Sequence, residues 1–493
     1  MEKEGDEMAQ KEDRVRFEAV IRSESEKSIF DQNAFLNNNN IDEYTPPAGR
    51  AQQAAKVLKS LNFQVHHVGT FSVSAEGPRS LWERVFKTRV KRETKTLGKA
   101  RAKNHQISYL SHQANTPFTM HKELEALLDK AYPQLPPVVL ESPLPPPVGY
   151  HHLNVPDDVA VILRAAHVHK EHIAGSGVLV AMPDTGFYNH SFYRWHGYNY
   201  HRTLSPDATD LDLDDIGHGT CQAANIFATA PNVEFLGIKM AFPGNATLAF
   251  KTASDLCPAV INMSWGWDNI GKNVPNYLKP LEAAIIEAVR KRGITICCAG
   301  GNSPSPDCFP AQMPEVIAVG GVGVSGDLNG DDFDLMASDY AISFDSNIYP
   351  GRHVPDVCGL VGMKPRGIYI VLPTQPNSVA DIDFALSGSP LHIDKTAQND
   401  GWLVTSGTSA ASPQVAGICA LLKEAQPGLA PDLMKAVLRA SARDVLKGYS
   451  ATGQPAGSGH DGATGAGLVD AYKAYRLALS MSPRSLSTLP SPR

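Results

Sequence analysis

The sequence contains no long hydrophobic run. None of its 493 residues falls in a stretch long and apolar enough to cross a bilayer. The first eight residues, Met-Glu-Lys-Glu-Gly-Asp-Glu-Met, include no apolar segment of the kind found in secretion signals. We therefore expect a cytoplasmic protein without a membrane partner, and the sequence leaves an unconventional export route open.

A basic surface is also missing from the sequence. Its 45 lysines and arginines are outnumbered by 51 acidic residues, and the formal net charge is -6. The densest basic run, 87–103, is interrupted by Glu93 and by polar residues, which is typical of a solvated loop. Nucleic acids and anionic membranes bind long basic stripes, so we expect neither as a partner.

Cysteine is scarce and confined to one part of the chain. The seven cysteines all lie between Cys221 and Cys419, and several fall in predicted core segments. An odd number of such residues indicates free, buried thiols rather than a disulfide framework, which fits a reducing compartment.

The most informative segment lies around residue 409. Residues 405–413 read Thr-Ser-Gly-Thr-Ser-Ala-Ala-Ser-Pro and precede an apolar run over 414–422. The pattern predicts a loop that turns into a helix with Pro413 in its first turn, where a missing N–H costs nothing. A hydroxyl at a helix start lies beside unpaired backbone N–H groups, so Ser409 is a candidate nucleophile. An N-cap for a buried helix would explain the same residues.

Two upstream segments supply partners for this serine. The apolar run 178–182 ends in Pro-Asp-Thr-Gly, which places the Asp184 carboxylate at the tip of a predicted strand. His218 stands just before a small-residue segment, 221–230, that is predicted to be helical. A serine hydroxyl needs a base to take its proton, and the base works best when a buried carboxylate fixes its tautomer. His218 is therefore the candidate base and Asp184 the residue that orients it. We also hypothesise that alkylation of Cys221 obstructs this base.

These three segments, in the order Asp, His, Ser, resemble those of the subtilisin-like (subtilase) serine peptidases. The resemblance covers roughly residues 150–478 and includes the segments 230–240, 260–266, 299–302, 314–321, 355–357 and 465–471. It implies an α/β fold with a doubly wound, mostly parallel sheet of subtilisin type. The alternation of predicted strands and helices favours the same architecture, in which active-site residues meet at the carboxyl ends of the strands.

The family resemblance implies four further site residues. Asn302, which follows the predicted strand 294–299, is expected to donate to an oxyanion together with the Ser409 backbone N–H. Ser264, Trp265 and Gly266 match the strand that binds an extended substrate through main-chain hydrogen bonds. The family usually has a smaller apolar residue at the position of Trp265, so we expect either a narrowed substrate pocket or a core tryptophan.

The N-terminal part is predicted to be a separate unit. Residues 1–13 are highly charged and indicate a disordered tail, whereas 14–132 alternate between strand and helix patterns. The expected strands are 15–21, 65–73 and 107–110, and the expected helices are 51–61 and 81–86. This order favours a small α+β domain of ferredoxin-like type. It resembles the prodomains of subtilases and of the related sedolisins, which cap the active site until they are cleaved. An unrelated module fused to a peptidase is the alternative.

Seven prolines between residues 133 and 149 predict an extended linker. Because a protease cleft binds extended chain, we expect self-cleavage close after the linker, near Gly149–Asn154. The peptidase domain is then expected over 150–478, followed by a disordered tail rich in serine and proline over 479–493.

No metal site is predicted. The segment Asp327–Asp334 is acidic but lacks the ligand spacing of a calcium loop. The calcium loop that the family carries after the histidine helix has no room here, because 221–230 runs straight into Pro231. We expect no cofactor and leave calcium open.

The sequence therefore predicts a serine endopeptidase that cleaves protein or peptide substrates through an acyl-enzyme. It would be made as an autoprocessed zymogen with its own prodomain as intramolecular inhibitor. Two alternatives stay open. An exopeptidase that releases short peptides would need a blocked cleft, for which Trp265 and the insertion from Gly326 to Trp402 leave room. A catalytically silent subtilase fold used as a binding module is the other.

Overall fold

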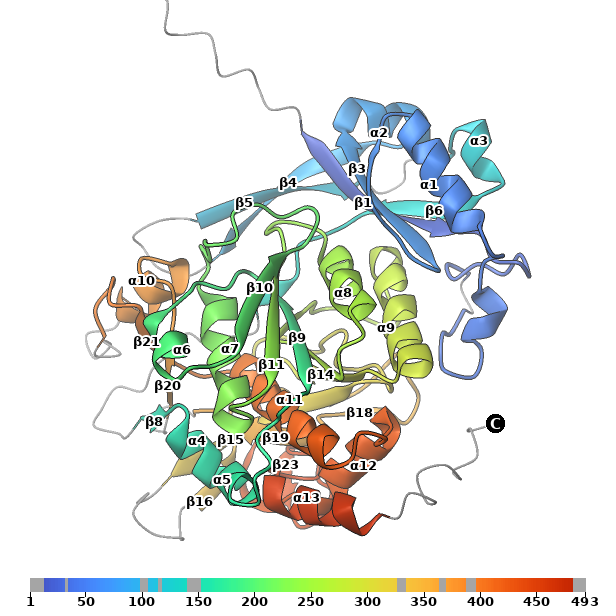
Figure 1. Ribbon diagram of the computed structural model, residues 1–493. Coiled ribbons are helices and arrows are strands. Elements are labelled where there is room, and N and C mark those ends of the chain that lie inside the picture. Colours follow the sequence, from blue (N-terminus) through green and yellow to red (C-terminus); the bar gives the residue numbers. More distant parts are fainter. Residues whose placement is uncertain are drawn as a thin grey trace, which may run out of the picture.

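The computed structural model describes residues 13–31, 34–97, 105–113, 118–139, 152–325, 334–362, 369–386 and 396–481. A small N-terminal unit sits on a larger unit built around a central sheet (Figure 1). Nearly all of the two expected tails, most of the acidic segment 327–334 and half of the expected cleavage region lie outside the described residues.

The N-terminal unit is a four-stranded antiparallel sheet in the order β2-β3-β1-β6. Two helices, α1 and α2, lie between its strands in the order that defines a ferredoxin-like domain, which confirms the expected class. Side chains of β1 alternate between two environments: Val15, Phe17 and Ala19 pack under the helices, whereas Glu18 and Val20 face the larger unit. The bounds are β1 (Arg14–Ile21), α1 (Arg50–Ser60), β2 (Gln64–Val68), β3 (Ser72–Pro78), α2 (Arg79–Phe86), α3 (Lys122–Glu125) and β6 (Leu128–Pro133).

Two expectations for this unit were wrong in detail. The run 65–73 is two strands rather than one, because Gly69 N donates to the Ser72 carbonyl (2.9 Å) and closes a turn. The strand expected at 107–110 belongs to a separate hairpin of β4 (Val90–Leu97) and β5 (His105–His112), and β6 completes the sheet instead.

The larger unit contains a ten-stranded, mostly parallel sheet with the order β10-β11-β9-β12-β14-β15-β16-β22-β23, while β19 also pairs with β15. Only the pairs β15/β16 and β22/β23 are antiparallel. The bounds are β9 (Leu179–Asp184), β10 (Tyr200–Leu204), β11 (Glu234–Lys239), β12 (Val260–Met263), β14 (Thr295–Ala299), β15 (Ile317–Ser325), β16 (Asp334–Ala337), β19 (Val357–Leu360), β22 (Val445–Tyr449) and β23 (Pro455–Gly457).

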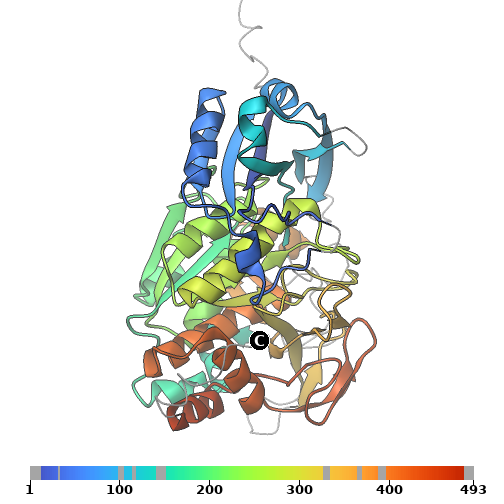
Figure 2. The same cartoon turned by 90° about the vertical axis from the view of Figure 1, so that its right-hand side faces the viewer.

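Helices cover both faces of this sheet (Figures 1 and 2). In β9, Val180 and Met182 pack with α7 (His218–Thr229) and α11 (Thr408–Ala425), whereas Ala181 packs with α8 (Ala246–Asp255) and α9 (Lys279–Arg292). A strand covered on both faces is apolar at every position, which explains the continuous apolar run 178–182. The doubly wound α/β fold expected from the sequence is therefore confirmed.

The remaining elements lie outside the two main sheets. They are β7 (Val138–Val139), β8 (Leu153–Asn154), α4 (Asp157–Ile162), α5 (Ala165–His169), α6 (Ser191–Trp195), β13 (Trp265–Gly266), β17 (Phe344–Asp345), β18 (His353–Val354), β20 (Ile370–Pro373), α10 (Val379–Leu386), β21 (Trp402–Thr405), α12 (Pro431–Ser441) and α13 (Ala471–Ser480), with single 3-10 turns at Ile41–Tyr44 and Asn276–Leu278.

Candidate active site

Asp184 and His218 meet at the carboxyl edge of the sheet. Asp184 is the last residue of β9 and His218 the first of α7. Asp184 Oδ1 lies 2.7 Å from His218 Nδ1, and both side chains are fully buried. With the carboxylate as acceptor, Nδ1 carries the ring proton, which leaves Nε2 as the basic nitrogen. The pair therefore has the geometry of an oriented general base.

A glycine lets the two elements approach this closely. A Cβ on Gly219 would lie 2.2 Å from the Gly186 carbonyl oxygen and 3.0 Å from Asp184 Cβ. Any other residue at this position would push the start of α7 away from the tip of β9. The Gly-His-Gly sequence is thus part of the site geometry.

A second buried carboxylate, Asp214, holds the same two elements together. It accepts hydrogen bonds from Thr185 Oγ1 (2.8 Å), Gly217 N (3.0 Å), Thr220 N (2.9 Å) and Thr220 Oγ1 (2.6 Å). Burial raises the pKa of Asp214, and the hydrogen bonds from Thr220 and Thr185 oppose that rise. Sequence reasoning missed this residue, although an aspartate four positions before the candidate base was a visible signal.

Ser409 is the second residue of α11 and is fully buried. Its Oγ donates to the Ser264 carbonyl (2.8 Å), and Ser264 Oγ donates to the Ser409 carbonyl (2.9 Å). α11 packs directly against α7, the helix that begins with His218.

We expected Pro413 in the first turn of the helix, but it lies one turn further in. The reason is that α11 already begins at Thr408. Proline has no N–H to bond to the carbonyl four residues before it, which is that of Ser409. The Ser264 hydroxyl supplies the missing donor, so the proline frees the Ser409 carbonyl for a contact with the neighbouring β12–β13 segment.

Asn302 lies beside the residue that precedes Ser409. Its Oδ1 accepts from Thr408 N (3.1 Å) and Thr408 Oγ1 (3.2 Å), and its side chain is buried. The amide nitrogen of Asn302 has no hydrogen-bond partner among the described residues. A buried, fixed N–H group without a partner is suited to a charge that appears only during a reaction.

The segment Ser264–Gly266 binds extended chain, in this case the protein's own. β13 pairs antiparallel with β7, with Trp265 opposite Val139 and Gly266 opposite Val138. The Trp265 indole does not line a pocket: it is fully buried, and its Nε1 donates to the Pro183 carbonyl (2.6 Å). Of the two readings of Trp265, the core tryptophan fits the structure.

The described residues include no group of three or more His, Cys, Asp or Glu side chains arranged to bind a metal ion. Within the same residues, no helix has the length and apolarity needed to span a membrane.

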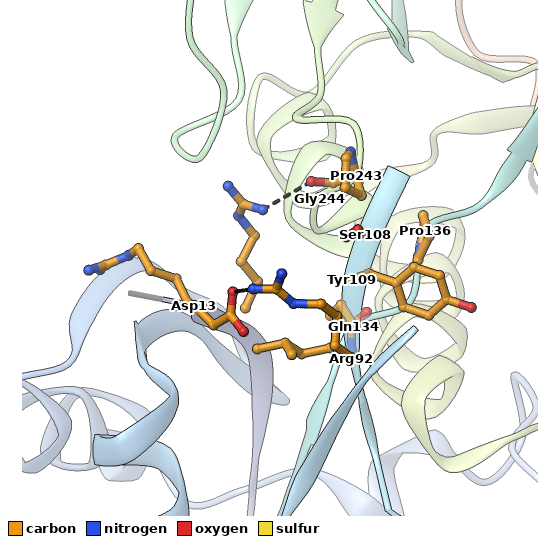
Figure 3. Close-up of a pocket in the computed structure, with 11 residues that line it drawn as sticks. Asp13, Arg92, Ser108, Tyr109, Gln134, Pro136, Pro243 and Gly244 are labelled. Carbon is orange, nitrogen blue, oxygen red and sulfur yellow. Dashed lines mark hydrogen bonds and ion pairs between the residues drawn. The ribbon is translucent and has the colours of Figure 1, made fainter. Parts of the chain in front are cut away.

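A cavity of about 340 Å³ lies away from these residues, where the N-terminal unit meets the Pro243–Gly244 loop (Figure 3). Three arginines line it, but each faces a carboxylate: Arg14 and Arg16 face Glu76 (2.9 and 3.4 Å), and Arg92 pairs with Asp13. Arg16 also lies 3.8 Å from Asp207. Each arginine of the cavity thus already faces a carboxylate of the protein, and we do not assign a site to it.

The chain is similar in sequence to known peptidases. The Peptidase_S8 model of the subtilase family matches residues 175–467. The chain is 28% identical to serine protease AprX of Bacillus subtilis (strain 168) over 302 residues, which cover 54% of this chain and 61% of AprX. It is 25% identical to subtilisin BL of Lederbergia lenta over 277 residues, which cover 54% of this chain and 83% of that protein. It spans 56% of alkaline elastase YaB of Bacillus sp. (strain YaB), so it covers less than two thirds of that relative and of AprX.

Two solved structures are similar in part. Pseudomonas sedolisin, complexed with pseudo-iodotyrostatin, has a TM-score of 0.49 at 20% identity, over 67% of this chain and 98% of sedolisin. Fervidolysin from Fervidobacterium pennivorans has a TM-score of 0.49 at 16% identity, over 94% of this chain and 61% of fervidolysin. The family match spans more than half of the sequence and includes the Asp184, His218 and Ser409 segments, so the chain belongs to the subtilase family of peptidases.

Proposed function

We propose that this protein is a serine endopeptidase with Asp184, His218 and Ser409 as its catalytic triad. The observation that carries the proposal is the buried hydrogen bond between Asp184 and His218, at the edge of the sheet where the helix of Ser409 also packs. Buried carboxylate–imidazole pairs of this kind keep a base ready to take a proton from serine.

In the proposed reaction, Ser409 Oγ attacks the scissile carbonyl carbon while His218 Nε2 takes its proton. The oxyanion accepts hydrogen bonds from Ser409 N and Asn302 Nδ2. His218 then gives the proton to the leaving amine as the C–N bond breaks, which leaves an acyl-enzyme. A water molecule hydrolyses this ester with the same proton transfers. Asp184 stays ionised throughout and stabilises the imidazolium ion.

We further propose that the protein is made as a zymogen whose N-terminal unit inhibits it. Two contacts support this proposal. First, β7 is hydrogen-bonded to the main chain of β13, where a substrate would bind. Second, the N-terminal sheet packs against α8 and α9 (Figure 2). Such strand pairing depends on backbone atoms, so β7 and a substrate compete for the same hydrogen bonds.

The β7 register suggests a cleavage point. Residue 264 precedes Trp265 and contacts Ser409 directly. A substrate bound in the register of β7 extends one residue beyond the position of Val139 and presents the peptide bond after that residue to Ser409. In this chain, the corresponding bond is Leu140–Glu141. We propose this bond as the self-cleavage site, upstream of the region near Gly149–Asn154 that the linker composition suggests.

The test is the intact mass of the wild-type protein and of Ser409→Ala, before and after treatment with a fluorophosphonate that acylates activated serines. The wild type alone is expected to lose its first 140 residues and to gain one adduct. An N-terminus elsewhere would refute the cleavage site but not the triad. Absence of both trimming and labelling, including after acid or mild protease treatment to remove the N-terminal unit, would favour the silent binding module.

A further inference from the structure

The tryptophan in the substrate strand is connected to the strand that carries Asp184. Trp265 lies in β13, and its indole Nε1 donates to the carbonyl of Pro183, the residue before Asp184, at 2.6 Å. The indole is fully buried. One side chain thus joins the segment that binds extended chain to the tip of the strand that orients the base.

The sheet leaves this carbonyl available. β12 pairs with β9 only at Val180 and Ala181, so no strand partner on that side reaches Pro183. On the other side of β9, Met240 N donates to the Asp184 carbonyl (2.9 Å). Because successive carbonyls of a strand point to opposite sides, the Pro183 carbonyl points toward β12. The indole therefore supplies the hydrogen bond that the sheet does not.

We propose that Trp265 is a positioning residue for catalysis: its indole N–H fixes the tip of β9 and, through it, the Asp184 carboxylate that orients His218. The inference rests on the proposed function, because it assigns Trp265 a role in the proposed triad. The Asp184 carboxylate itself has few partners: besides His218, the described residues give its side chain only Thr185 N as a hydrogen-bond partner (2.8 Å). A shift of its backbone is thus passed directly to the base.

The neighbouring tryptophan provides a matched control. Trp267 is also buried, at 5% exposure, and its ring packs edge-on against that of Trp265 with 5.6 Å between centroids. Its Nε1 has no hydrogen-bond partner among the described residues. Replacing either tryptophan with phenylalanine removes the same atoms from the same cluster, but only Trp265→Phe removes a hydrogen bond.

The first experiment compares the steady-state kinetics of processed wild type, Trp265→Phe and Trp267→Phe on a peptide substrate, together with their melting temperatures. We expect Trp265→Phe to lower kcat by about ten- to a hundredfold with little change in KM, because small displacements of a catalytic group cost rate rather than binding. Trp267→Phe should lower the melting temperature similarly and leave kcat within about twofold. A third variant carries β-(3-benzothienyl)alanine at position 265, which keeps the bicyclic shape without the N–H and should match Trp265→Phe.

The second experiment asks whether Trp265 acts through Asp184. In an Asp184→Asn background, the orienting carboxylate is absent, so Trp265→Phe should cause no further loss of kcat. Equal kcat for wild type and the benzothienyl variant, or a full additional loss in the Asp184→Asn background, would overturn the inference. An inactive wild type that does not label with fluorophosphonate would instead refute the proposed function itself.

Discussion

Glu18 of the N-terminal unit and Lys251 of α8 form an ion pair that is almost completely excluded from solvent. Glu18 Oε2 lies 3.1 Å from Lys251 Nζ, and the side chains are 0% and 6% exposed. Ser72 Oγ donates to the same carboxylate at 2.7 Å and Asn245 Nδ2 at 2.8 Å, while Lys251 also donates to Ser74 Oγ at 2.8 Å. The two units are therefore joined by a polar network in which each charge is paired and hydrogen-bonded.

Breaking this pair should release the N-terminal unit. Glu18→Gln or Lys251→Met leaves one buried charge without its partner, which costs about 3–5 kcal/mol, or roughly two to four orders of magnitude in affinity. We expect the cleaved N-terminal fragment of either variant to separate from the peptidase during gel filtration, whereas the wild-type fragment co-elutes. Glu83→Gln, in a half-exposed pair with Arg79 within α2, is the control and should behave like the wild type. The double variant should be less affected than the single ones, because no charge is left unpaired.

The same contact should be sensitive to acid. Burial raises the pKa of Glu18, but the Lys251 charge and hydrogen bonds from Ser72, Ser74 and Asn245 outweigh it, so the net pKa lies below its ordinary value of 4.5. A lowered pKa in the complex means that the stabilisation is fully present above pH 4.5 and is lost as the pH falls through the lowered value. Titration of fragment release in the wild type should show a step in acid that Glu18→Gln lacks. An identical profile in both proteins would contradict this role.

Asp214 should be needed for activity even though it takes no part in the proposed proton transfers. Asp214→Asn replaces an oxygen acceptor with an amide N–H group and leaves at least one of the four donors unpaired, at about 1–3 kcal/mol each. We expect a lower melting temperature and a fall in kcat, because Asp214 bridges the loops of Asp184 and His218. Asp212→Asn, in the same loop but 81% exposed, is the control. Unchanged kcat in Asp214→Asn would show that the bridge is dispensable.

Removal of the proposed oxyanion donor should affect the rate selectively. Asn302→Ala deletes the buried amide whose nitrogen has no partner among the described residues, and loss of one such donor typically costs about a hundred- to a thousandfold in kcat. KM should change little. Asn232→Ala is the control, because Asn232 lies just before β11, at the amino ends of the parallel strands and away from the proposed site. A proportional rise in KM with unchanged kcat would assign Asn302 to substrate binding instead.

The cysteines should differ sharply in reactivity. Cys257 is exposed, whereas the six others are buried. Cys221 Sγ donates to the His218 carbonyl (3.1 Å), so an alkyl group there would disturb the start of α7. We expect the native protein to react rapidly with one equivalent of a thiol-alkylating reagent and to keep full activity. Cys257→Ser should take up none of this reagent on the same timescale. Slower labelling of Cys221, located by peptide mass mapping, should track the loss of activity; full activity after that modification would refute the steric hypothesis.

Much of the fold could be predicted from local patterns. The amphipathic segment 278–292 ends at Gly293, and α9 does end there, because Gly293 adopts a positive φ of 65° that suits glycine. The positions of Asp184 after an apolar strand and of His218 and Ser409 at helix starts also follow from local sequence, since strand ends and helix caps depend on residues close in the chain.

The tertiary structure decided what these residues contact. The sequence did not reveal that the Trp265 indole bonds to Pro183, that Ser264 replaces the N–H that Pro413 lacks, or that Glu18 meets Lys251, which is 233 residues away along the chain. Such contacts depend on strand register and on how two units pack. A local pattern fixes which side of a strand or helix is buried, but not which distant side chain lies against it.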